Sequence, residues 1–431
     1  MLSLRRSPGL LAHDVFDRGV ASALAPVASA VNDTSCFVVT SGGRTLVDER
    51  GTAAVMPASN LKLITASVAP ELLGDAHTFT TEVAGSADGA VVNGDLFLVG
   101  GGDPVLATAA YARSGEYPEN PYTSLDALAD QLVKAGVRRV TGSIVADGSR
   151  YDGERYPPTW DEAIRKHEAG PLSAAMVNDA KVVPVPPPAD LAAIVPGDDP
   201  DVSAAQQLTL ALRQRGVQVT GEGKAGLRPL TAGVLAEVTS APLSKIVGEM
   251  LTTSDDNTAE LLLKEVGLQR SGEGTREAGI AAELATLQSW KVPTNGLVIV
   301  DGSGLSRQNR VPCSTFAAVL AHEGAKGPVY DGLPIAAKTG TLGVDPDNRA
   351  AFAGTPAAGK LRAKTGTLSG AKALSGYYPL ANGQALEISL IVNTADPNAS
   401  ADEGRALWRA LGNALGKVPQ GPTAEQLAPA S

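Results

Sequence analysis

The chain of 431 residues is long enough for two or three domains, each with its own core. Its net charge of −10 argues against nucleic acid or an acidic membrane surface as a partner, although a buried local cation would still allow an anionic substrate. No stretch approaches the roughly 18 apolar residues of a membrane-spanning helix. Arg5 and Arg6 are not followed by the apolar segment of a signal peptide.

The two cysteines, Cys36 and Cys313, either form one disulfide or remain two buried thiols. The sequence alone does not decide between these alternatives. The alternative of two free thiols that act as small core residues is slightly favoured, because free cysteine is among the most buried residue types.

The predicted elements begin with a β-hairpin and an apolar helix. Alternating residues from 36 to 47 flank the turn Ser41-Gly42-Gly43 and predict the hairpin. The apolar run that begins near Ser59 predicts the helix. From about Phe79 the sequence changes to short strands with glycine-rich turns. The later predicted elements are a helix at 204–215, helical segments at 243–263 and 313–322, strands at 373–378 and 386–392, and a final helix at 401–415.

The order of these elements predicts an α/β fold. Asn382-Gly383 between the last two strands is a strong hairpin signal. We expect the N- and C-terminal strands to join in one antiparallel sheet flanked by helices. Residues 1–77 plus 236–431 would form this domain, and residues 78–235 would form a strand-rich insertion of one domain or two nested domains.

Ser59 and Lys62 form an S-x-x-K pair at the start of the predicted apolar helix. Positions i and i+3 share a helix face, so the hydroxyl and the amine can meet. Lysine can activate a serine nucleophile if burial or a second cation lowers its pKa. For Ser59 alone, a simple helix N-cap is the alternative. A second copy, Ser369-Gly370-Ala371-Lys372, is flanked by glycine and fits a turn into a strand better than a helix.

The string K-T-G-T-L occurs twice, at 338–342 and 364–368. The second copy runs directly toward the terminal hairpin, so we expect it on an edge strand beside the Ser59 helix, with Lys364 as the second cation. Two like charges ~4 Å apart at a dielectric of ~20 repel by about 4 kcal/mol, or roughly three pKa units. The first copy leads into a loop-like segment. A solvated lysine before a turn is the alternative for either copy.

Residues 250–262 place a polar cluster between two apolar stretches. The functional interpretation is that Ser254 relays a proton between Lys62 and a leaving amine. The alternative is that the cluster caps a helix that begins near Thr258.

Other catalytic motifs are absent from the sequence. The four histidines form no H-E-x-x-H, and there is neither a G-x-S-x-G nucleophile elbow nor a phosphate-binding loop. We therefore expect neither a metal nor a cofactor.

With the three motifs in this order, the sequence resembles the penicillin-recognising serine D,D-peptidases, for which such a set is characteristic. More narrowly, it resembles the D-alanyl-D-alanine carboxypeptidase/endopeptidase family of low-molecular-mass class C penicillin-binding proteins, peptidase family S13. The resemblance covers residues 30–415 and implies a serine transpeptidase/β-lactamase-like fold with a large insertion after the first motif. Further strings that support it are LVGGGDP at 98–104, GPLS at 170–173, VND at 177–179 and VDGSGLSR at 300–307.

The resemblance also implies residue roles. Ser59 would attack a peptidoglycan stem peptide ending in D-Ala-D-Ala, Lys62 would take its proton, and Ser254 would pass a proton to the departing D-alanine. Lys364 would hold the terminal carboxylate, and the N–H groups of Ser59 and Thr367 would form the oxyanion hole. The residues expected to bind substrate are Thr365, Gly366, Thr367, Asp256 and Asn257.

The second motif departs from the S-x-N of the family, because the sequence places Asp256 where asparagine is expected. A carboxylate beside Lys62 would favour its ammonium form and oppose a general-base role. We hypothesise that Asp256 points elsewhere and that Asn257, or a reoriented loop, takes its place.

The resemblance implies that β-lactams acylate Ser59 and that the protein works outside the cytoplasmic membrane, where peptidoglycan is assembled. Two alternatives remain. A serine β-lactamase or esterase on the same fold would need a deacylating base. A catalytically weak peptidoglycan- or β-lactam-binding protein is made credible by Asp256.

Overall fold

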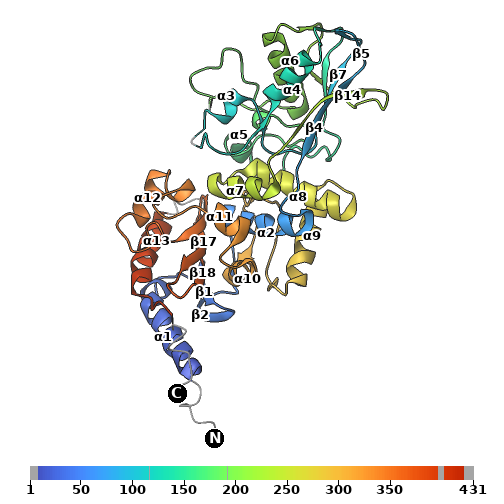
Figure 1. Ribbon diagram of the computed structural model, residues 1–431. Coiled ribbons are helices and arrows are strands. Elements are labelled where there is room, and N and C mark those ends of the chain that lie inside the picture. Colours follow the sequence, from blue (N-terminus) through green and yellow to red (C-terminus); the bar gives the residue numbers. More distant parts are fainter. Residues whose placement is uncertain (1–7, 116, 192, 397–401, 422–431) are drawn as a thin grey trace.

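The structure is a computed structural model that describes residues 8–115, 117–191, 193–396 and 402–421. They form two bodies that lie end to end (Figure 1). The lower body combines the two ends of the described chain, and the upper body is built from its middle.

A five-stranded antiparallel sheet is the centre of the lower body, with the strand order β16-β17-β18-β1-β2. Strand β18 pairs with β1, from Cys36 opposite Ile391 to Thr40 opposite Glu387, which confirms the expected junction of the two chain ends. All nine residues of β18 are buried, because helices cover both faces of the sheet. The strands are β1 (Cys36–Ser41), β2 (Arg44–Glu49), β16 (Arg362–Leu368), β17 (Ala371–Pro379) and β18 (Ala385–Asn393).

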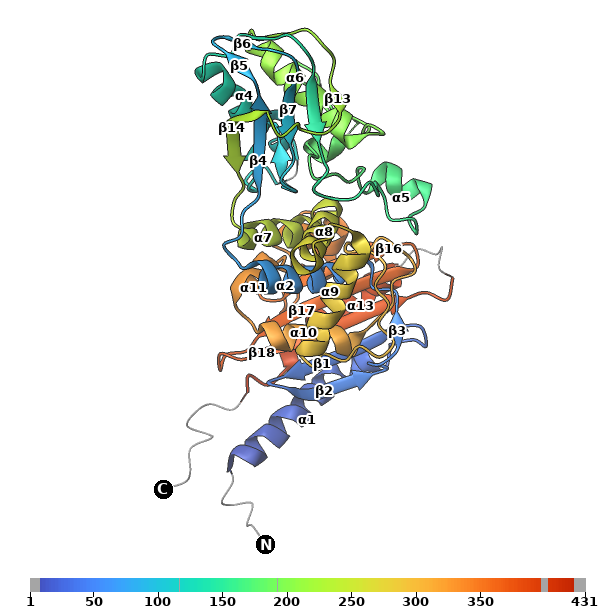
Figure 2. The same cartoon turned by 90° about the vertical axis from the view of Figure 1, so that its right-hand side faces the viewer.

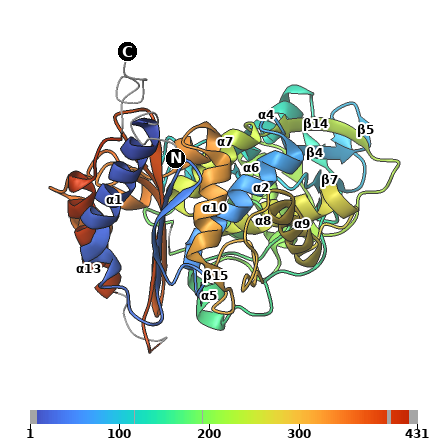
Figure 3. The ribbon, with the colours of Figure 1, turned by 90° about the horizontal axis from the view of Figure 1, so that it is seen from below.

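Helices lie on both sides of this sheet, which Figure 3 shows nearly edge-on. One side carries α1 (Pro8–Ala28), α12 (Pro346–Phe352) and α13 (Asp402–Ala414), followed by the short turn η5 (Leu415–Lys417). Helix α1 is not among the predicted elements. Its buried residues nevertheless recur at helical spacing, at Phe16, Val20, Leu24 and Val27.

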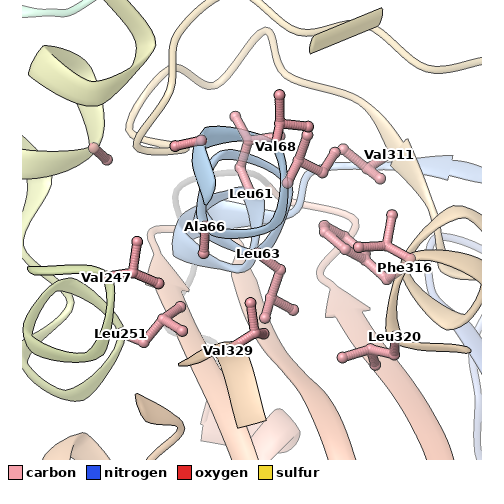
Figure 4. Packing of buried hydrophobic residues seen from close by; sticks show 14 of the residues in the cluster. Leu61, Leu63, Ala66, Val68, Val247, Leu251, Val311, Phe316, Leu320 and Val329 are labelled. Carbon is pink, nitrogen blue, oxygen red and sulfur yellow. The ribbon is translucent and has the colours of Figure 1, made fainter. Parts of the chain in front are cut away.

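The other side of the sheet is occupied by a helical layer around α2 (Figure 4). Leu61, Leu63, Ile64 and Val68 are fully buried there, because neighbouring helices surround α2. A helix that is buried on all sides is a core helix, and this explains why apolar residues occur around the whole circumference of α2. The layer contains η2 (Ala58–Leu61), α2 (Lys62–Leu73), α7 (Leu243–Thr253), α8 (Asp256–Ser271), α9 (Arg276–Ser289), α10 (Cys313–Glu323) and α11 (Gly327–Gly332).

Most strands of the upper body belong to a four-stranded and a five-stranded sheet, and helices pack beside them (Figure 2). Their strand orders are β12-β10-β6-β5 and β13-β11-β7-β4-β14. The strands are β4 (Thr80–Gly85), β5 (Ala87–Asp88), β6 (Val91–Val92), β7 (Leu96–Val99), β10 (Arg139–Val140), β11 (Ile144–Asp147), β12 (Gln218–Val219), β13 (Lys224–Ala225) and β14 (Gly233–Thr239). The helices are α3 (Ala109–Ala112), α4 (Leu125–Lys134), α5 (Glu162–His167) and α6 (Pro200–Gln214), with the short turn η3 (Asn178–Ala180).

Strands β4 and β14 connect the two bodies. They pair antiparallel, with Thr80 opposite Thr239, so the chain enters and leaves the upper body side by side. We propose that the inserted unit ends near Thr239, after β14, because a boundary at residue 235 would divide a paired strand. Smaller pairs complete the fold: β3 (Ala54–Val55) with β15 (Val311–Pro312), and β8 (Leu106–Ala107) with β9 (Thr123–Ser124).

Cys36 and Cys313 form a disulfide, with 5.9 Å between their Cα atoms. The favoured expectation of two free thiols is therefore wrong. The bond joins the start of β1 to the start of α10 and fixes this helix against the central sheet. Within the described parts of the chain, no helix combines the length and the apolar character needed to cross a membrane.

Candidate active site

Ser59 lies in η2, one turn before α2 begins at Lys62. The preceding Ala58 has a φ of 47°, a left-handed conformation that costs a residue with a side chain roughly 1–2 kcal/mol. Lys62 is 0% exposed, and its Nζ donates to Ser59 Oγ at 3.1 Å. Ser59 does not act as an N-cap, because the cap positions of η2 and α2 are Pro57 and Leu61. The partly exposed hydroxyl is thus held next to a buried amine.

Ser254 lies between α7 and α8, where the predicted helical segment 243–263 is interrupted. Its φ of 69° ends α7, and Asp255 caps α8 by accepting from Thr258 N at 2.5 Å. The polar cluster therefore does cap a helix, through Asp255. This turn also leaves the Ser254 hydroxyl to accept a hydrogen bond from Lys364 Nζ at 2.7 Å.

Lys364 lies on β16, an edge strand of the central sheet that runs next to η2. A Cβ at Gly366 would lie 2.8 Å from Pro57 O, so only glycine permits this close approach of the strand to η2. The Lys364 side chain is fully buried, and its Nζ also donates to Thr365 O at 2.8 Å. Burial and, next, the neighbouring Lys62 ammonium lower the pKa of Lys364 well below its usual range, while Asp256 opposes this shift.

Asp256 contacts Lys62 directly, with 2.5 Å between Oδ1 and Nζ. The hypothesis that Asp256 points elsewhere is therefore wrong. Asn257 does not take its place, because the Asn257 amide faces the upper body, where it accepts from Gly170 N at 3.1 Å. The reason is helical geometry: Asp256 and Asn257 are consecutive residues of α8 and so point about 100° apart.

The Asp256 side chain is 12% exposed. Burial raises its pKa to about 6, although the Lys62 ammonium opposes the shift, and the nearby carboxylates of Asp255 and Glu168 add to it. Above this pKa the Asp256 side chain is a carboxylate, and it lies beside Lys62 in the position where the family pattern expects a neutral amide.

A loop at residues 300–309 supplies a contact that none of the three sequence motifs indicates. Lys62 Nζ donates to the backbone oxygen of Ser303 at 2.9 Å. The loop is held by the buried carboxyl groups of Asp301 and Glu260, whose oxygens accept hydrogen bonds from backbone N–H groups within it. The string VDGSGLSR marked the loop in the sequence, but a backbone acceptor has no side-chain signature.

The alternative copies of the two lysine motifs lie outside this cluster of contacts. Ser369 is exposed in the turn between β16 and β17, and Lys338 is exposed before η4 (Gly340–Leu342). The structure thus brings Ser59, Lys62 and Asp256 into one set of contacts, and Ser254 with Lys364 into another. The two sets are linked by the electrostatic interaction of Lys364 with Lys62 and Asp256.

The sequence profile of the D-Ala-D-Ala carboxypeptidase 3 (S13) family matches residues 27–190 and 186–413. The chain belongs to this family. It is therefore a serine-type D-Ala-D-Ala carboxypeptidase, and the family resemblance of its motifs is confirmed.

Two relatives of this S13 enzyme show how far the similarity extends. It is 32% identical to a D-alanyl-D-alanine carboxypeptidase of Actinomadura sp. (strain R39), over 83% of this chain and 76% of the relative. It is 33% identical to carboxypeptidase DacB of Mycolicibacterium smegmatis, over 92% of this chain and 85% of the relative.

The fold of the S13 enzyme is similar to that of penicillin binding protein 4 (dacB) from Haemophilus influenzae. The TM-score is 0.75 at 21% identity, and the match covers 91% of this chain and 99% of the other. The expected penicillin-recognising α/β fold with an additional strand-rich body is confirmed.

Proposed function

We propose that this S13 carboxypeptidase works through a covalent acyl-enzyme on Ser59 and that penicillin forms a longer-lived ester with the same residue. The observation that carries the proposal is the 3.1 Å contact between Ser59 Oγ and the buried Lys62 Nζ. A serine hydroxyl becomes an effective nucleophile when a base lies within hydrogen-bond reach. The family's D-Ala-D-Ala specificity supplies the substrate class, peptidoglycan stem peptides with that terminus.

The proposed first step transfers one proton and forms one bond. Ser59 Oγ attacks the carbonyl carbon of the penultimate D-alanine while its proton passes to Lys62 Nζ, in molecules whose Lys62 side chain is the neutral amine. The N–H groups of Ser59 and Thr367 stabilise the developing oxyanion, an effect worth about 3 kcal/mol per donor in comparable enzymes. Ser254 then delivers its hydroxyl proton to the leaving nitrogen and regains one from Lys62, so the peptide bond breaks and D-alanine departs. Water hydrolyses the remaining ester.

Lys364 is proposed to hold the terminal carboxylate of the peptide together with the hydroxyls of Thr365 and Thr367. Its contact with Ser254 supports this role, because the same ammonium then connects the carboxylate with the proton relay. Charge-assisted hydrogen bonds of this kind are about twice as strong as neutral ones.

A catalytically weak β-lactam-binding protein is the second candidate, and the Asp256–Lys62 contact is what favours it. A carboxylate at 2.5 Å opposes removal of the lysine proton. Acylation would then be slow and turnover slower. The two candidates differ only in rate, so a kinetic experiment separates them.

We place the protein outside the cytoplasmic membrane. The Cys36–Cys313 disulfide supports this location, because structural disulfides persist mainly in oxidising compartments. A peptidase that acts on assembled cell wall would also meet its substrate there.

Labelling with a fluorescent penicillin, followed by an assay for released D-alanine, tests the proposal. The wild-type protein should keep the label and release D-alanine from a tripeptide ending in D-Ala-D-Ala. Ser59→Ala should lose both signals, and Ser369→Ala, the matched change in the second S-x-x-K copy, should keep both. Label without release would favour the binding protein, and rapid loss of label would favour a β-lactamase. A cross-linked peptide dimer as substrate reveals any endopeptidase activity.

A further inference from the structure

The two motif copies that lie outside the catalytic contacts each touch one threonine of the K-T-G-T segment on β16. Lys372, from the second S-x-x-K, donates from Nζ to Thr367 Oγ1 at 2.6 Å. Thr341, from the first K-T-G-T, lies 2.7 Å from Thr365 Oγ1 through its own hydroxyl. Thr365 and Thr367 are two residues apart on a strand, so their side chains lie on the same face.

The Lys372 contact is built into the sheet. Lys372 lies on β17 directly opposite Thr367, in the register of the antiparallel pair. Its side chain is buried, and Nζ lies 5.1 Å from the centre of the Trp408 ring of α13. Burying a lysine is costly unless its ammonium has partners. The ammonium is thus kept at a fixed place behind Thr367.

The direction of the hydrogen bond from Lys372 to Thr367 decides whether the Thr367 hydroxyl can donate to a further group. An ammonium group only donates, so Thr367 Oγ1 must accept from Lys372. The Thr367 hydroxyl proton is therefore available to another acceptor, and Thr367 is exposed. A hydroxyl polarised by a cation and turned outward in this way is a donor suited to an anion.

Thr341 acts on Thr365 in a similar manner. Thr365 is buried, and either hydroxyl of this pair can donate to the other. When Thr365 donates to an anion, Thr341 can donate to Thr365, which keeps both hydroxyls satisfied. Asn348 holds the Thr341 backbone by donating from Nδ2 to Thr341 O at 3.1 Å.

We propose that Lys372 and Thr341 are positioning residues that turn the Thr367 and Thr365 hydroxyls toward the substrate carboxylate, and that Lys372 makes the site discriminate a free C-terminal carboxylate from its amide. The inference rests on the proposed role of Thr365 and Thr367. Lys372 acts through Thr367, and its positive charge favours an anion at the exposed side of that hydroxyl.

A binding experiment that needs no turnover tests the inference. Calorimetry compares a tripeptide ending in D-Ala-D-Ala with the same peptide capped as a C-terminal amide, both on Ser59→Ala protein. The Ser59→Ala protein should bind the free carboxylate more tightly. Adding Lys372→Met, which keeps the apolar length of the side chain against Trp408, should weaken carboxylate binding about tenfold, as expected for loss of a charge-assisted contact, and should leave amide binding within about twofold.

Three further variants complete the test on the same background. Lys372→Arg should retain most of the preference for the carboxylate, and Thr341→Val should reduce it by about threefold, because only a neutral hydrogen bond is lost. Lys338→Met, an exposed lysine in the other K-T-G-T copy, is the matched control and should change nothing.

The inference is overturned if the Ser59→Ala protein does not prefer the free carboxylate over the amide. It is also overturned if adding Lys372→Met leaves that preference unchanged. If Lys372→Met instead weakens binding of both peptides equally, Lys372 supports the fold and does not set the carboxylate preference. That outcome also overturns the inference. Failure of penicillin to label Ser59 would overturn the proposed acyl-enzyme without altering these affinities, so the two failures are distinguishable.

Discussion

Lys62 and Asp256 form an ion pair with 2.5 Å between Nζ and Oδ1, although Lys62 is also the amine that contacts the Ser59 hydroxyl. One ammonium group thus contacts the proposed nucleophile and a carboxylate. Since the family pattern has a neutral amide at the position of Asp256, this carboxylate is the feature of the site with the largest expected effect on its chemistry.

Replacing Asp256 by asparagine should accelerate acylation. The neutral amide can accept a hydrogen bond from Lys62 but removes the charge that holds its proton, so the amine should take the Ser59 proton more readily. We expect the second-order rate constant for penicillin labelling at pH 7 to rise by about tenfold or more, equivalent to about 1.4 kcal/mol in the barrier. Stopped-flow or quenched labelling measures it.

Asp152→Asn is the control for this variant, because Asp152 pairs with the buried Lys264 outside the site. It should leave the labelling rate unchanged. Slower labelling in Asp256→Asn would contradict the prediction and would mean that the carboxylate assists removal of the lysine proton.

Lys364 should make substrate binding sensitive to alkaline pH. Burial and the Lys62 ammonium lower its pKa well below the usual range, so Lys364 loses its charge at a pH where an exposed lysine would keep it. We therefore expect kcat/KM for a D-Ala-D-Ala tripeptide to fall on the alkaline side before pH reaches about 10, mainly through KM. Arginine stays charged throughout this range.

The Lys364→Arg variant should flatten this alkaline limb, even if its kcat is lower because the longer side chain fits less well beside Ser254. Lys338→Arg, in the exposed copy of the motif, should keep the wild-type profile. An identical alkaline limb in Lys364→Arg would assign the titration to another group.

The arrangement of the main elements could be predicted because its signals are local. Asn382-Gly383 marks the turn of the terminal hairpin, and the apolar run after Ser59 marks the core helix. Local context also distinguishes the motif copies, because the glycine beside Ser369 fits a turn and not a helix. In the structure Ser369 lies in the turn between β16 and β17.

The contacts within the site could not be predicted in the same way, because they depend on how loops turn in space. The left-handed conformation of Ser254 sets where α8 begins. This starting point decides that Asp256, and not the next residue Asn257, faces Lys62. The Ser303 contact uses a backbone oxygen, which every residue type offers equally. The contacts of Lys372 and Thr341 depend on strand register and loop packing across the sheet.

The Cys36–Cys313 disulfide should contribute to stability without being part of the chemistry. It joins residues separated by 277 positions, so it removes much conformational freedom from the unfolded chain. Replacing both cysteines by alanine should lower the free energy of unfolding by about 2–5 kcal/mol. Calorimetry with and without reductant measures the effect: reductant should lower the Tm of the wild type but not of the variant. Penicillin labelling at 25 °C should be unchanged, and an equal Tm for both proteins would contradict the prediction.

Glu283 should make the protein less stable as pH rises from 5 to 8. The side chain is fully buried in α9, and its Oε1 accepts from Thr65 Oγ1 at 2.8 Å. Burial raises the pKa of Glu283 to about 8, the Thr65 hydrogen bond opposes the shift, and the nearby Glu260 and Asp301 carboxylates add to it. The unfolded chain loses this proton near pH 4.5, so between these values the folded state binds more protons and the free energy of unfolding falls with pH.

Glu283→Gln mimics the protonated carboxyl group at every pH. It should therefore remove the part of the pH-dependent fall in the free energy of unfolding that comes from Glu283. Thermal denaturation at pH 5 and pH 8 should therefore show a smaller drop in Tm for Glu283→Gln than for the wild type. Glu273→Gln changes an exposed carboxylate and should keep the full wild-type drop. If Glu283→Gln declines as steeply as the wild type, the proton is held elsewhere, and Glu260, whose pKa burial also raises to about 8, is the next residue to replace.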